Sequence, residues 1–209
     1  MAVPLAHVIF VLDDSGSMSF YTEETKRAFD AFVSTLQKVK GSQIVLTLIK
    51  YGDSCEVVYK AKPIQDVGKL EYNPKSSYDI PYDAVHFAAE IAEAEKRSNK
   101  VVICLLCDGG DNASKHTRGE ARKLIERKLK EGWEFCFLAA GDRGYIYCPA
   151  EVAKRIGIPE NCIIKYAQGH DGGKAIEAFG ASAWNIGSYA AGRAEHVSYT
   201  ADQKKKVGG

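Results

Sequence analysis

The sequence has no run of about 18 apolar residues, and its first residues lack the basic-then-apolar pattern of a secretory signal. A membrane-spanning helix is therefore not expected, and we expect a cytoplasmic protein. The sequence also has no large excess of positive or negative charge, because the formal net charge is +1. Nothing in that balance favours nucleic acid or a membrane surface as a partner.

A disulfide framework is not indicated either. The chain has 6 cysteines, and its CxxC pair, Cys104 and Cys107, lies inside an apolar run with no second CxxC or histidine pair after it. Zinc ligation or a disulfide would need such partners. We therefore interpret the cysteines as reduced and mostly buried thiols.

The 209 residues suffice for one good core. We expect one domain over residues 1–195 and a flexible basic tail over residues 196–209. Apolar and amphipathic periodicities predict an α/β fold, a doubly wound and mostly parallel sheet with helices on both faces. The short link Gly52–Ser54 predicts a hairpin, and hence one antiparallel edge strand. The expected strands are 6–13, 43–51, 55–61, 101–107, 133–140 and 163–166, and the expected helices are 23–39, 81–96, 115–131, 150–156 and 173–193.

The first strand and the loop after it organise the chain. Five apolar residues, Val8 to Leu12, run directly into Asp13-x-Ser15-x-Ser17. A run this short and apolar indicates a strand buried on both faces, and open α/β sheets carry their sites at the carboxyl ends of such strands. One carboxylate and two hydroxyls suit a hard cation such as Mg²⁺ or Mn²⁺, whereas the alternative is a turn that caps the next helix.

A second carboxylate loop favours the metal interpretation. Asp108 follows the apolar run 101–107, so both loops open on the same side of the sheet if the two strands are neighbours. The segment Tyr78–Ala84 enters a helix from that side and carries Asp79. Asp79 is either a further ligand or the N-cap of that helix, and Pro81 at an early helical position favours the cap.

Four segments resemble the von Willebrand factor A (VWA) domain family, and the resemblance extends over roughly residues 6–195. They are VIFVLDDSGSM (8–18), YDIPYDAV (78–85), LLCDGGDNAS (105–114) and GWEFCFLAAG (132–141), the last resembling bacterial and phage-type members. The resemblance implies a metal-ion-dependent adhesion site formed by Asp13, Ser15, Ser17 and Asp108. The family usually has a threonine where this sequence has Asp79, so the chain departs from the pattern at one metal position.

The resemblance implies binding and not catalysis. Mg²⁺, or Mn²⁺ or Ca²⁺ in its place, would keep an open coordination position that an acidic side chain of a partner protein completes. The surrounding residues expected to meet the partner are Asp14, Met18, Tyr78, Asp111 and Asn112.

Two other functions stay open at the level of sequence. The first is a Mg²⁺-dependent phosphohydrolase, although the sequence lacks a glycine-rich phosphate loop and a basic residue in the carboxylate loops. The second is a VWA scaffold that binds its partner without metal, which the departure at Asp79 would explain.

Overall fold

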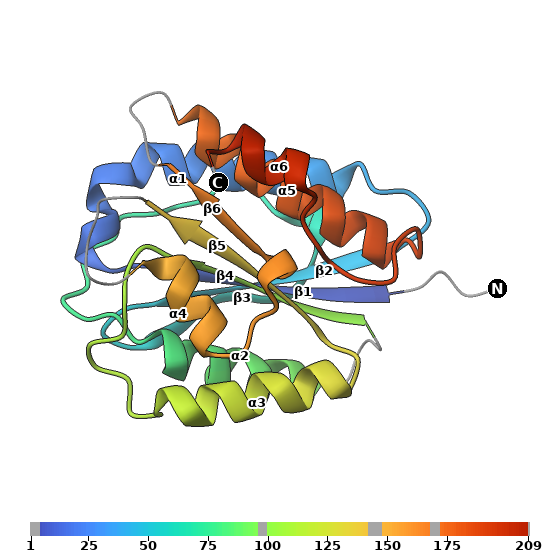
Figure 1. Cartoon of the computed structure of the whole chain (residues 1–209). Coiled ribbons are helices and arrows are strands. Elements are labelled where there is room, and N and C mark those ends of the chain that lie inside the picture. The colour runs from blue at the N-terminus through green and yellow to red at the C-terminus, as the bar shows by residue number, and fades with distance from the viewer. Residues whose placement is uncertain (1–4, 96–99, 142–147, 168–171, 209) are drawn as a thin grey trace.

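The computed structural model describes residues 5–95, 100–141, 148–167 and 172–208. At its centre lies a six-stranded sheet in the order β3-β2-β1-β4-β5-β6 (Figure 1). All neighbouring pairs are parallel except β2 and β3, which form the antiparallel edge. The predicted fold class is therefore confirmed. The strands are β1 (Leu5–Asp13), β2 (Gln43–Tyr51), β3 (Cys55–Pro63), β4 (Lys100–Cys107), β5 (Glu134–Ala140) and β6 (Ile163–Tyr166).

Helices cover both faces of the sheet. In Figure 1, α1, α5 and α6 lie on one side and α2, α3 and α4 on the other. None of the helices in the described part of the chain combines the length and apolarity needed to span a bilayer. The helices are α1 (Thr22–Gln37), α2 (Pro81–Glu95), α3 (Arg118–Lys130), α4 (Pro149–Arg155), α5 (Gly173–Ala190) and α6 (Ala201–Lys206).

The central strand β1 is buried on both faces, which explains its uninterrupted apolar sequence. Successive residues point to opposite sides, so Phe10 joins the core under α1 and α5 while Ile9 joins the core under α2 and α3. The Phe10 ring packs against those of Phe29 and Phe32 on α1, at centroid distances of 5.2 and 5.0 Å. Packing from both sides fixes β1, and with it the loop that follows Asp13.

Helix α5 approaches the end of α1 closely, and a glycine permits this. A Cβ on Gly187 would lie 2.6 Å from a methyl group of Val39, so a larger residue would push the two segments apart. Helical spacing in residues 173–193 predicts Ile176, Phe179, Ala183 and Ile186 as the packing side of α5, with Trp184 beside them. Phe179, Ala183 and Ile186 are buried and Ile176 is half-buried. Trp184, expected beside them, is instead 64% exposed.

The segment 196–208 differs from the flexible tail that the sequence predicts. Val197 and Val207 are buried in the core under α5, and the Tyr199 hydroxyl lies 2.7 Å from Ser182 Oγ. The Val197 N–H also donates to Glu134 Oε2 at 3.0 Å. The run of three lysines suggested solvation, but the valines and tyrosine around it bury enough apolar surface to order the segment.

Helix α6 begins with a capping box that the sequence analysis did not use. Thr200 Oγ1 accepts from the Gln203 N–H at 3.2 Å, and Gln203 Oε1 accepts from the Thr200 N–H at 2.9 Å. We expect Thr200→Ala to lower the free energy of unfolding by about 1 kcal/mol, measured by urea denaturation. Lys205→Ala, at an exposed position of the same helix, should change it by less than about 0.5 kcal/mol. Equal midpoints for the two variants would mean that the cap contributes nothing.

Candidate metal centre

Strand order brings the carboxylate loops together. β1 lies beside β4, so the loops after these strands open at the same end of the sheet, here called the rim. Asp13 is the last residue of β1, and Asp108 directly follows Cys107, the last residue of β4. Asp79 precedes α2 and reaches the same region. The neighbouring strands that the sequence argument required are thus present.

The carboxylate of Asp13 is fully buried and is oriented by its neighbours. The Ser15 N–H donates to Oδ1 at 2.9 Å, and the Tyr51 hydroxyl donates to Oδ2 at 3.2 Å. The Asp108 N–H donates to Oδ2 at 3.4 Å, and the Tyr72 hydroxyl donates to the Asp13 carbonyl oxygen. Three donors therefore hold the carboxylate and a fourth holds the main chain of the same residue.

Asp79 is also buried, with 6% of its surface exposed. Its backbone is tied to the loop after β4, because its N–H donates to Asn112 Oδ1 at 2.9 Å and its carbonyl accepts from the Asn112 N–H at 3.0 Å. Its side-chain Oδ1, by contrast, is buried and has no hydrogen-bond partner among the described residues. A buried polar atom without a partner is costly, so it points to a ligand.

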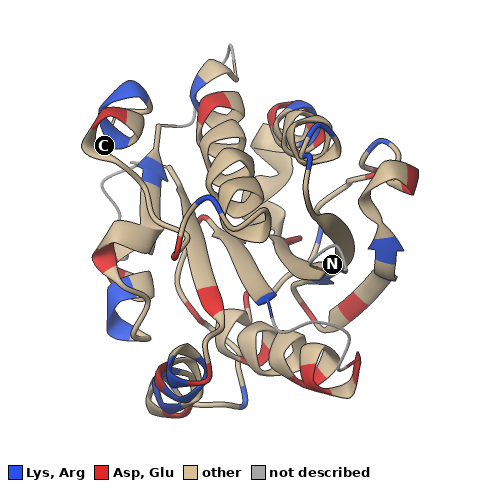
Figure 2. Ribbon diagram, turned by 90° about the vertical axis from the view of Figure 1, so that its right-hand side faces the viewer, with Lys and Arg blue, Asp and Glu red and all other residues tan. Residues whose placement is uncertain are grey.

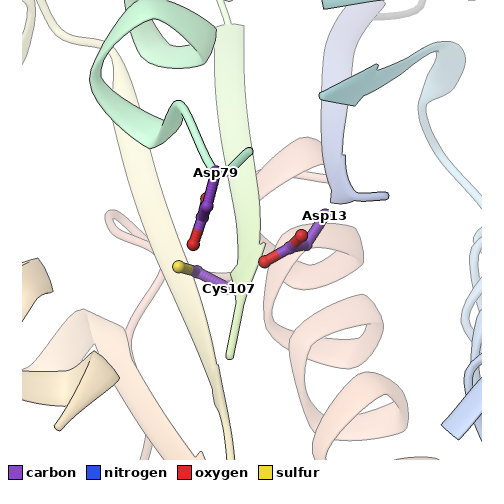
Figure 3. Close-up of side chains that lie close together, drawn as sticks. All are labelled: Asp13, Asp79 and Cys107. Carbon is purple, nitrogen blue, oxygen red and sulfur yellow. The ribbon is translucent and has the colours of Figure 1, made fainter. Parts of the chain in front are cut away.

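The carboxylates of Asp13 and Asp79 and the thiol of Cys107 point toward one another (Figure 3). One ligand atom from each side chain lies within 4.8 Å of the other two. In the chain segments that the structure describes, no other group of three or more His, Cys, Asp or Glu residues converges in this way. Asp79 therefore faces the cluster and does not act as the helix cap that was the alternative.

The cluster is electrostatically strained without a cation. Burial, followed by the charge of Asp108, raises the pKa of Asp13 to about 7. Burial, followed by the charges of Asp13 and Asp108, raises the pKa of Asp79 to about 9. Burial, followed by the charges of Asp79 and Asp13, raises the pKa of the Cys107 thiol well above its usual value. A nearby cation would favour the ionised form of each group, so these residues fit a divalent metal.

The two serines lie next to this cluster. Ser15 Oγ is 3.0 Å from Ser17 Oγ, and the Ser17 hydroxyl donates to Asp108 Oδ1 at 3.0 Å. Ser15 is buried, whereas Ser17 is exposed at the rim. The structure thus brings the predicted metal residues Asp13, Ser15, Ser17, Asp79 and Asp108 into one region, with side-chain oxygen atoms extending from the interior to the surface.

The residues predicted to meet a partner have different environments. Tyr78 is 55% exposed and Asn112 is exposed, although Asn112 also holds the Asp79 loop. Asp14 and Asp111 are half-buried, and Asp111 Oδ1 accepts from the Ser114 N–H.

The expectation for Met18 is wrong, because this side chain is fully buried. The loop after Asp13 turns into the 3₁₀ helix Gly16–Tyr21, and that turn directs Met18 into the core under α1 and α5.

Sequence analysis missed several residues of the rim. Cys107 had been interpreted as a core thiol, and Tyr51 and Tyr72 had no assigned role. The signal for Tyr51 was its position at the end of β2, where it pairs in register with Asp13. Phe20 was also missed, although it is 77% exposed and lies only a few residues after Ser17. Its helical neighbours gave no sign that it would face solvent.

Comparison with known proteins agrees with this geometry. The sequence profile described as von Willebrand factor type A domain matches residues 7–143. A search among curated protein sequences found no match.

Similar solved structures include three with the same fold. The pilus adhesin SpaC of Lactobacillus rhamnosus GG has a TM-score of 0.70 at 13% identity, with 91% of this chain and 31% of that chain covered. The vWF domain of the type V pili tip protein Mfa5 of Porphyromonas gingivalis has a TM-score of 0.64 at 11% identity, with 91% and 97% covered. Proximal thread matrix protein 1 of the mussel byssus, with a zinc-occupied MIDAS motif, has a TM-score of 0.61 at 15% identity, with 90% and 48% covered. The chain thus spans about half of the byssus protein and a third of the adhesin.

Proposed function

The chain belongs to the von Willebrand factor type A domain family, and from this premise we propose that it is a protein-binding module whose binding surface depends on a divalent cation at the rim. VWA domains often bind a divalent metal, and in the similar structures they belong to adhesins and pilus proteins. The proposal for this chain goes further, because it assigns metal dependence and a partner surface.

One observation carries the metal dependence. Asp79 Oδ1 is buried, has no hydrogen-bond partner among the described residues, and faces the fully buried carboxylate of Asp13. Two buried carboxylates this close repel each other, and a cation between them converts that repulsion into attraction.

The proposed ligands are Asp13, Ser15, Ser17, Asp79 and Asp108, which agrees with an oxygen-rich site. When bound, the cation would supply a Lewis-acidic position for an acidic side chain of a partner protein. The chain's own contribution is to orient the loops around that position. The Tyr51 and Tyr72 hydroxyls hold Asp13, and Asn112 holds Asp79.

Two exposed aromatic side chains support a protein as the partner. Phe20 is 77% exposed and lies in the 3₁₀ helix within the loop region that follows Asp13, and Tyr78 is 55% exposed and directly precedes Asp79 in the loop before α2. The two loops are joined, because the Gly16 N–H donates to the Ser76 carbonyl at 2.8 Å. Exposed aromatic residues next to polar groups are characteristic of binding surfaces. Charges of both signs are mixed on most of the helices, and α2 carries acidic residues only (Figure 2), which does not favour nucleic acid or an anionic membrane.

We further propose that the protein is not an enzyme and that it acts in the cytoplasm of a bacterium or in a cell infected by a bacteriophage. The cysteines support a reducing compartment, since all six are free thiols. The pilus and adhesin descriptions of the similar structures support binding over catalysis.

The proposal is tested by capturing partners on the immobilised protein from a lysate of its source organism. We expect proteins that are retained with Mg²⁺ or Mn²⁺ and released by EDTA. Phe20→Ala should reduce that retention about tenfold, because a buried aromatic anchor carries much of the energy of an interface. Trp184→Ala removes another largely exposed aromatic side chain, 64% exposed, from α5 and should leave retention unchanged. If neither EDTA nor Phe20→Ala reduces the amount of partner protein retained, the proposal is contradicted.

A further inference from the structure

We propose that the Cys107 thiol is a ligand of the cation at this site and makes the site prefer zinc-like cations over Mg²⁺. This inference rests on the proposed metal site and adds the class of cation. It departs from the expectation from sequence, in which the ligands are oxygen atoms only and the thiols are reduced and mostly buried.

The position of Cys107 distinguishes it from the other buried thiols. Cys104 and Cys136 are also fully buried, but they belong to the core under α1 and α5. Cys107 is the last residue of β4, and its Sγ lies within 4.8 Å of carboxylate oxygens of both Asp13 and Asp79. A thiol that only fills the core would be expected among apolar groups, not between two carboxylates.

The present hydrogen bond of Cys107 does not prevent ligation. Its thiol donates to the Gly109 carbonyl at 3.0 Å. Such a bond is weak, and the proton that makes it is the one lost when a metal binds sulfur. The sulfur that remains faces Asp79, whose Oδ1 has no hydrogen-bond partner among the residues described (Figure 3).

The separation of the three groups suits a small cation. Zinc binds sulfur at about 2.3 Å and carboxylate oxygen at about 2.0–2.2 Å, so tetrahedral ligands lie about 3.5 Å apart. In the structure the three ligand atoms lie within 4.8 Å of one another, and small side-chain rotations would bring them to the spacing that zinc requires. Because all three side chains are buried, a cation among them would be largely removed from water.

The donor set decides which cation is favoured. Thiolate ligands favour Zn²⁺ and similar thiophilic ions, whereas Mg²⁺ gains little from sulfur and gives up its water reluctantly. Asp13 and Asp79 already balance a divalent charge, and Asp108 beside them brings the carboxylates to −3. A thiolate adds a fourth negative charge, and it is tolerated only where the metal–sulfur bond is strong.

The test uses the full chain, freed of metal by EDTA and then titrated with Co²⁺ and Cd²⁺. We expect a thiolate-to-metal charge-transfer absorption in the ultraviolet. It should increase until one equivalent of metal per protein chain has been added. Cys107→Ser should remove this absorption and weaken Zn²⁺ binding by at least about tenfold. The same variant should keep its Mg²⁺ affinity within about twofold, because Mg²⁺ gains little from sulfur. Cys104→Ser, in the other core, should keep the absorption.

The outcomes separate this inference from the proposed function. Binding of Mg²⁺ and Co²⁺ without the absorption would overturn the role of Cys107 and leave the proposed module intact. No binding of any of these cations would overturn both. If Cys107→Ser does not fold, the wild-type spectrum still decides, and Asp79→Asn should then abolish the absorption while all thiols remain.

Discussion

Asp13→Asn is expected to weaken the binding of Mn²⁺ by about a hundredfold or more, because it removes the charge of the central ligand of the proposed site. The change removes no volume, so the fold should persist. An asparagine oxygen can still accept from the Ser15 N–H, and its amide can donate to the Tyr51 hydroxyl, which then donates to the Leu106 carbonyl 2.9 Å away. Titration calorimetry measures the affinity, and far-ultraviolet circular dichroism checks the fold.

The matched control for this prediction is the next residue. Asp14→Asn also removes one carboxylate charge from the same loop, but Asp14 lies outside the cluster. Burial raises the pKa of Asp14, whereas the charge of Lys50 lowers it, so its environment is the side of the loop that faces β2. Its Mn²⁺ affinity should stay within about threefold of wild type at normal salt. Equal losses in the two variants would show that net charge, and not ligation by Asp13, governs binding.

The fold could be predicted from sequence because its signals are local and agree with one another. The apolar run of β1 and the short link between β2 and β3 each have one simple structural solution. The pairing of β1 with β4 was only a condition at the level of sequence, and because the structure pairs them, Asp13 and Asp108 share the rim.

The remaining features depend on contacts between distant segments, which a local pattern does not contain. Met18 lies in a motif that suggested the surface, yet the 3₁₀ turn directs it inward. Cys107 was counted with the core because its neighbours in sequence are apolar, and only the Asp79 loop reveals its polar side. The segment after residue 195 was judged by its lysines, although Val197 and Val207 anchor it.

The substitution Asp79→Thr restores the residue type usual in the resembled family, and it should have opposite effects on the metal-free and metal-bound protein. It removes a buried carboxylate whose Oδ1 has no hydrogen-bond partner among the described residues. Metal-free Asp79→Thr should therefore unfold at a higher urea concentration than wild type at pH 8. Its affinity for Mn²⁺ should fall by at least about tenfold, because a charged ligand is lost.

The dependence on pH follows from the raised pKa of Asp79. Above about pH 4 the unfolded chain releases this proton, whereas the folded, metal-free protein keeps it until the pH approaches 9. The folded state therefore binds more protons in this range, and the stability of the EDTA-treated protein should fall as the pH rises from 4 to 9. Asp79→Thr should flatten this decline, measured by urea denaturation at a series of pH values. A slope equal to that of wild type would show that Asp79 is already ionised.

The substitution Asp79→Thr also tests how tightly the proposed site binds an acidic partner. Asp13, Asp79 and Asp108 together carry −3 against +2 for the cation, so an incoming carboxylate meets a negative site. One surplus charge at about 4 Å and an effective dielectric constant near 20 opposes it by roughly 4 kcal/mol. Wild type should therefore bind its partner mainly through Phe20 and Tyr78, with the metal ordering the loops between them. Asp79→Thr brings the carboxylates to −2, so it should bind an acidic peptide more tightly in saturating Mn²⁺, even though it holds the metal less tightly. If peptide affinity instead falls in parallel with metal affinity, Asp79 helps to recruit the partner, and the charge argument fails.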